Sequence, residues 1–88
     1  MAIPKSSDTI DLLIVSPDEV IFEDKITRLI APGVFQDIAL LPDHTPLYAE
    51  LKQGDLKITK ADGGKETISI ETGIVRVKSN RISVITGF

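Results

Sequence analysis

The chain has 88 residues, 42% of them hydrophobic, which is enough for one small domain with a single core but not for a deep, enclosed active site as well. The formal net charge is −3 and no basic patch stands out, which argues against nucleic acid and anionic membrane surfaces as partners. With no cysteine, one histidine and no apolar run of transmembrane or signal-peptide length, the chain excludes disulfides and thiolate metal sites, and we expect a soluble, intracellular protein.

The N-terminal third of the chain predicts short strands separated by turns. The first strand is rich in Ile, Leu and Val, and Pro17 follows it at the second position of a turn, where proline is favoured. The charged residues 23–25 suggest a further turn, and Pro32-Gly33 ends the third expected strand. In order, we expect a flexible lead-in at residues 1–8, strands at 9–16, 19–22 and 26–31, and turns at 16–19, 23–25 and 32–33.

The rest of the chain continues with the same alternation of strands and turns. Apolar and polar residues alternate most clearly in its last four strands, as on the two faces of a half-buried strand. Asp62-Gly63 is a hairpin signal, because this pair tolerates the positive φ that tight hairpin turns require. The further strands are expected at 35–41, 47–51, 55–60, 65–71, 74–78 and 81–86.

Two prolines enclose a corner between the strands expected at 35–41 and 47–51. Proline fixes φ and lacks an N–H donor, so we interpret Pro42, His44 and Pro46 as a rigid structural corner. A lone histidine in such a corner is more often a structural hydrogen-bonding residue than a catalyst. Two strands held at a fixed corner are a suitable platform for contact with another molecule.

Residues 12–15 and 38–41 are apolar at consecutive positions, so both faces of each strand are apolar. Two explanations stay open: both faces are covered within the domain, or one face meets a protein partner. About nine short strands, turn signals roughly every 8–12 residues and no helical period predict an all-β fold. We expect an antiparallel β-sandwich or flattened barrel of about nine to ten short strands over residues 9–88.

The sequence offers no arrangement of residues typical of catalysis. The histidine has no serine at a recognisable nucleophile elbow, and the carboxylates are scattered over predicted turns, where they suit solvated positions better than an acid–base pair. Gly63-Gly64 is followed by neither a helix nor a Lys-Ser/Thr pair, so it does not predict a phosphate-binding loop. We therefore predict that the protein is not an enzyme and has no catalytic residue, cofactor or metal site.

Several short motifs occur in the order found in a known family. Residues 12–17 (LLIVSP) are followed by Phe22, by Ala31-Pro32-Gly33, and by residues 36–47 (QDIALLPDHTPL), 51–58 (LKQGDLKI) and 72–77 (TGIVRV). Over roughly residues 9–86, this series resembles the N-terminal domain of the epsilon subunit of F-type ATP synthases. The Pro-x-His-x-Pro core within it is the most specific of the motifs.

The resemblance implies a β-sandwich with a structural role in the central stalk of a proton- or sodium-translocating ATP synthase. Such a subunit binds the gamma subunit and the ring of c subunits and helps couple rotation to ATP synthesis. The implied location is the cytoplasmic face of the inner (plasma) membrane, as a peripheral part of the complex without direct membrane insertion. The resemblance places Ser16, His44 and Ala49 at the gamma subunit and Asp37 near the c ring. We also expect Leu40 to contact the gamma subunit and Gln36 to contact the c ring.

The chain departs from the family pattern at several positions. Gln36, Ala39, Asp43 and Thr72 replace family glycines, and Arg76 replaces an acidic residue, so the loop expected to face the ring is altered. The sequence reaches Phe88 without the two-helix C-terminal domain of most members, so we expect no inhibitory helices in this chain.

Two other functions are alternatives to a rotor subunit. An unrelated β-sandwich module could bind protein or carbohydrate, but carbohydrate platforms usually stack sugars on aromatic rings, and this chain has 5% aromatic residues and no tryptophan. A small hydrolase would require a nucleophile–base pair, which the sequence does not show.

Overall fold

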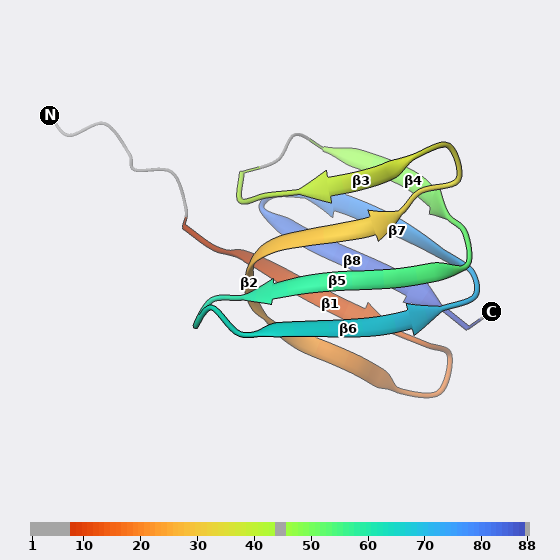
Figure 1. Ribbon diagram of the computed structural model, residues 1–88, viewed down its shortest axis with the longest axis horizontal. Coiled ribbons are helices and arrows are strands. Elements are labelled where there is room, and N and C mark those ends of the chain that lie inside the picture. Colours follow the sequence, from red (N-terminus) through yellow and green to blue (C-terminus); the bar gives the residue numbers. More distant parts are fainter. Residues whose placement is uncertain (1–7, 44–45, 88) are drawn as a thin grey trace, which may run out of the picture.

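The computed structural model describes residues 8–43 and 46–87, in which eight strands and no helix are found (Figure 1). Within this part of the chain, no helix is long and apolar enough to cross a membrane. The expected lead-in at residues 1–8, apart from Asp8, and His44 of the expected corner lie outside the described residues. The strands are β1 (Ile10–Val15), β2 (Val20–Pro32), β3 (Asp37–Leu40), β4 (Leu47–Leu51), β5 (Gly54–Lys60), β6 (Lys65–Ile70), β7 (Gly73–Lys78) and β8 (Arg81–Thr86).

All eight strands belong to one hydrogen-bonded sheet that folds over into two layers (Figure 1). One layer contains β4, β7, β8, β1 and the first half of β2, and the other contains β3, the second half of β2, β5 and β6. β2 belongs to both layers, since Ile26 lies opposite Ile10 of β1 and Leu29 lies between Leu40 of β3 and Ile58 of β5. The expected all-β fold is thus confirmed.

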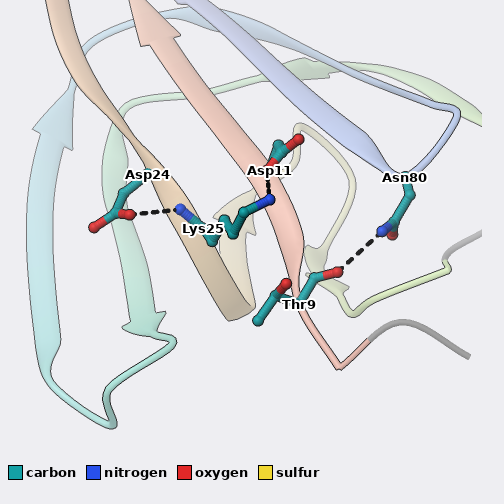
Figure 2. Close-up of polar contacts among 5 residues, drawn as sticks. All are labelled: Thr9, Asp11, Asp24, Lys25 and Asn80. Atoms are coloured by element: carbon teal, nitrogen blue, oxygen red, sulfur yellow. Dashed lines mark hydrogen bonds and ion pairs between the residues drawn. The ribbon is translucent and has the colours of Figure 1, made fainter.

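The strands number eight rather than nine or ten, because β2 is continuous across residues 23–25, where we expected a turn. These residues pair with β1, and their charged side chains are exposed. A run of charges without glycine or proline can remain in a strand when its side chains reach solvent. Lys25 Nζ also lies 2.9 Å from Asp11 Oδ1 on β1, so a charged pair joins the two strands here (Figure 2).

The strand directions agree only approximately with the expected antiparallel arrangement. Six of the seven strand pairings are antiparallel, but β1 and β8 run parallel to each other. Turn signals in a sequence reveal hairpins, which join antiparallel neighbours, whereas parallel neighbours are joined by a long connection that leaves no local signal. Here the parallel neighbours are the first and last strands, with the rest of the sheet between them in the sequence.

One hydrophobic core lies between the two layers. In β1 the three inward side chains are buried, whereas Leu13 and Val15 alternate with them and are half-buried. Of residues 38–41, only Leu40 is fully buried. Each of the two doubly apolar stretches therefore contributes one face to the core and leaves its other face incompletely covered. The core consists of Ile10, Leu12, Ile14, Ile26, Leu29, Ala31, Leu40, Leu51, Leu56, Ile58, Ile70, Val75, Val77, Ile82 and Val84.

One side chain, Asn80, ties the β7–β8 turn to two other segments. Ser79 and Asn80 both have positive φ, 53° and 56°, as the favoured two-residue hairpin turns require. The Asn80 carboxamide accepts a hydrogen bond from the Asp43 N–H at 2.8 Å and donates one to the Thr9 carbonyl at 2.9 Å, the latter drawn in Figure 2. The corner after β3 and the start of β1 are thereby held against the same turn.

Substitution of Asn80 should separate its two structural roles. Asn80→Gly keeps a residue that accepts positive φ but removes both side-chain hydrogen bonds, and should lower the free energy of unfolding by about 1–2 kcal/mol. Asn80→Ala also places a less tolerant residue at positive φ, and should cost about 1 kcal/mol more. Denaturant unfolding of both variants beside the wild type measures these differences. A glycine variant as stable as the wild type would show that the carboxamide does not hold the three segments together.

Candidate protein interface

The described residues contain no group of three or more His, Cys, Asp or Glu side chains placed to hold a metal ion. Several of the charged side chains instead join neighbouring strands: Lys60 Nζ lies 3.3 Å from Glu66 Oε2, and Ser69 Oγ donates to Asp55 Oδ1 at 2.8 Å. The features of this chain that stand out are therefore surfaces.

The loop between β2 and β3 carries a fully exposed aromatic side chain. Phe35 is 100% exposed and Val34 is 46% exposed. The base of the loop is nevertheless hydrogen-bonded to the end of β4. The Val34 N–H donates to the Glu50 carbonyl at 3.1 Å, and the Lys52 N–H donates to the Pro32 carbonyl at 2.9 Å. The loop therefore presents an apolar tip from a hydrogen-bonded base.

Gly33 makes the tight bend of this loop possible. It is buried, it forms a β-bridge with the end of β4, and a Cβ at this position would meet the carbonyl oxygen of Gln36 and the side chain of Ile38. After the bend, β3 begins at Asp37 rather than at Phe35, where we expected it to begin. Phe35 is thus a loop residue and not a strand residue.

An open groove of about 380 Å³ lies between this loop and β4. Ile38, Leu47 and Ala49 line it and are half-buried side chains that pack against the core. Val34 and Phe35 line it from the loop. An exposed apolar surface beside a groove is typical of a site where another protein binds.

The groove brings together two residues that we expected to contact different partners. Gln36, expected at the c ring, and Ala49, expected at the gamma subunit, both line it, and Asp37 is exposed at the start of β3. Leu40 was expected to contact the gamma subunit, but the alternation of β3 turns its side chain inward, where it is fully buried. Leu40 is therefore a core residue and not part of this surface.

The two remaining residues expected at the gamma subunit are Ser16 and His44. Ser16 is half-buried in the β1–β2 turn, which is closed by a hydrogen bond of 2.9 Å from its N–H to the Glu19 carbonyl. His44, in the expected corner between Pro42 and Pro46, is outside the described residues. The contact of Ser16 and His44 with one partner therefore stays a prediction.

The sequence pattern alone does not identify Val34 and Phe35 as surface residues. Two apolar residues before an apolar strand look like the start of that strand. The available signal was the Pro-Gly pair directly before them, which marks a bend and so places the next residues in a loop.

Comparisons with known proteins agree on one family. A family model described as "ATP synthase, Delta/Epsilon chain, beta-sandwich domain" matches residues 9–87. The chain is similar to the ATP synthase epsilon chain of Dichelobacter nodosus, with 32% identity over 79 residues, which cover 90% of this chain and 55% of that protein. It is also similar to the ATP synthase epsilon chain of Leptospira interrogans, with 35% identity over 81 residues, which cover 92% of this chain and 63% of that protein. The chain thus spans between about half and two thirds of these relatives.

Solved structures share the fold. A chain in the cryo-EM structure of the Euglena gracilis mitochondrial ATP synthase, "OSCP/F1/c-ring in rotational state 1", superposes with a TM-score of 0.84 and 19% identity, covering 98% of this chain and 59% of that chain. A chain in the "central stalk/cring" structure of the Tetrahymena thermophila mitochondrial ATP synthase gives a TM-score of 0.74 and 15% identity, covering 97% and 67%.

Removal of the exposed aromatic ring of Phe35 should leave the fold intact. Phe35→Ser should change the free energy of unfolding by less than about 0.5 kcal/mol, since surface substitutions away from packed positions have small effects. As a matched control, Leu40→Ala removes a buried side chain nearby and should cost about 2–5 kcal/mol. Urea unfolding measures both. A Phe35 variant as unstable as the Leu40 variant would mean that the Phe35 ring packs against the chain.

Proposed function

The chain belongs to the ATP synthase delta/epsilon chain family, and on this premise we propose that it is a rotor subunit in the central stalk of an F-type, proton- or sodium-translocating ATP synthase. The family match from residue 9 to residue 87 includes all eight described strands, so it rests on the whole fold and not on one motif. In this role the chain catalyses no reaction. It contacts the gamma subunit and the c ring and helps couple rotation of the ring to ATP synthesis.

The c ring is the proposed partner of the loop between β2 and β3. The observation that carries the proposal is the full exposure of Phe35 on a loop with a hydrogen-bonded base, directly before Gln36 and Asp37. An apolar side chain in this position can be buried against a partner with little rearrangement of the loop. Support also comes from the Euglena and Tetrahymena structures, which include a c ring.

The gamma subunit is the proposed partner of Ser16, His44 and Ala49. Ala49 lines the same groove as Gln36, so this proposal brings gamma and the ring to neighbouring parts of one surface. The location that follows is peripheral to the membrane sector, at the cytoplasmic face of the membrane.

A charge placed in the groove should weaken binding of the gamma subunit. Ala49→Arg puts an unpaired charge among half-buried apolar side chains, and should lower affinity for a gamma-containing catalytic complex prepared without this chain by about a hundredfold or more. Thr67→Arg, at an exposed position of β6, introduces the same side chain away from the groove and serves as the control. Calorimetric titration of the complex with each chain gives the affinities. Equal affinity of the two variants would contradict a gamma contact at Ala49.

Loss of the Phe35 side chain should weaken the coupling between ATP hydrolysis and ion pumping, while the complex should still assemble. In a reconstituted enzyme, Phe35→Ser should keep ATP hydrolysis but reduce the number of ions pumped per ATP hydrolysed, because the apolar contact with the c ring is lost. Ion pumping and ATP hydrolysis are measured on the same vesicles, with Thr67→Ser as the control. An unchanged pumping ratio would contradict a ring contact through Phe35.

A further inference from the structure

The turn between β5 and β6 contains the only Asp-Gly pair in the sequence, Asp62-Gly63. Figure 1 shows this turn at one end of the two strands, and residues 61–64 are exposed to solvent. In an Asp-Gly pair, the main-chain nitrogen of the glycine can attack the preceding carboxyl group with little steric hindrance, because glycine has no Cβ. Asp62 is therefore the aspartate of this chain that is most open to such an attack.

The reaction is a ring closure followed by hydrolysis. The Gly63 nitrogen forms a bond with Cγ of Asp62, and one carboxyl oxygen leaves as water, which carries away the N–H proton and a proton taken from solvent. A second water molecule then opens the five-membered succinimide at one of its two carbonyls. Opening at Cγ restores aspartate. Opening at the main-chain carbonyl breaks the original peptide bond and leaves isoaspartate, whose backbone runs through the former side chain and is longer by one methylene.

In the folded chain, hydrogen bonds hold both reacting groups. The Gly64 N–H donates to Asp62 Oδ1 at 2.7 Å, so the carboxylate bonds the nitrogen beyond Gly63 and not Gly63 itself. The Gly63 N–H donates to the Lys60 carbonyl at 3.0 Å. Ring closure requires both hydrogen bonds to break, and the closed turn therefore opposes the reaction.

The turn depends on a few exposed interactions and not on packing. Residues 61–63 form a three-residue loop, which the Lys60 N–H closes by donating to the Gly64 carbonyl at 2.7 Å. Gly63 has a φ of 90°, the positive value expected at the last position of such a loop. A Cβ at Gly63 would meet no other part of the described chain within 4 Å, and the ion pair of 3.3 Å between Lys60 and Glu66 is partly exposed. A hairpin tip of this kind opens at a lower free energy than the whole domain.

We propose that Asp62 is a site of spontaneous isomerisation to isoaspartate and that the closed β5–β6 turn limits its rate. The reaction proceeds through the fraction of molecules in which the turn is locally open. The product has a longer loop and no longer has the side chain that accepts the Gly64 N–H, so an isomerised molecule should not close the turn in the same way. The inference concerns the chain itself and goes beyond its proposed place in the rotor.

The test follows the full chain in buffer and in about 6 M guanidinium chloride, at the same pH and temperature. Samples taken over several weeks are digested, and the fragments that contain Asp62 are separated by chromatography and weighed by mass spectrometry. Isoaspartate changes the retention of the fragment but not its mass, whereas the succinimide is lighter by one water. The folded chain should convert about ten- to a hundredfold more slowly than the unfolded chain. The other aspartates are internal references and should convert far more slowly than Asp62 in the denaturant.

Two variants establish the site and the attacking group. Asp62→Glu lengthens the side chain by one methylene, so the five-membered ring cannot form, and conversion at this position should be lost in both solutions. Gly63→Ala places a methyl group beside the attacking nitrogen and should slow conversion in guanidinium chloride. This variant is compared with the wild type in the denaturant alone, where the strain of alanine at positive φ has no effect.

Three other results would overturn parts of the inference. No conversion of Asp62 in either solution would show that it is not a site of modification. Equal rates in the two solutions would show that the closed turn gives no protection. If the folded chain is slower by as much as its folding equilibrium constant, obtained from denaturant unfolding, the reaction waits for global unfolding and not for local opening of the turn.

Discussion

The constraint on which this structure depends is the participation of β2 in both layers of the sheet. Its first half forms a ladder with β1, and its second half lies between β3 and β5, so its 13 residues join the two layers through one continuous backbone. Ile26, Leu29 and Ala31 are fully buried along it, where the layers meet. A relative movement of the layers would break backbone hydrogen bonds and open the core at the same time. The surfaces on the two layers are therefore held at a fixed separation.

That rigidity suits a subunit that transmits force between partners. The loop with Phe35 leaves the end of β2 directly, so its base is continuous with the strand that links the layers. The outer face of β1, β8 and β7 belongs to the other layer. In the proposed rotor, a load applied at the loop would reach the outer face through β2 and the packed core, without a hinge in the described strands.

Much of the fold could be predicted from alternation alone. In the last four strands, the residues predicted to face inward are buried, as Leu56 and Ile58 illustrate, except for Ile68, which is half-buried, and Gly63 has the positive φ expected of its hairpin. The errors occur where local pattern carries no information on pairing. The charges at residues 23–25 remained in a strand because β1 pairs with them, and consecutive apolar residues could not indicate that Leu40 faces inward.

The parallel pairing of the first strand with the last has a consequence for biosynthesis. β1 can form its ladder with β2 early, but its other edge has no partner until residues 81–85 have been made. An open strand edge with half-buried apolar residues such as Leu13 and Val15 is a site for unwanted pairing with other chains. Such long-range pairing also slows folding, typically to about milliseconds to seconds. The edge of β1 that faces β8 therefore stays open to aggregation until β8 has been synthesised.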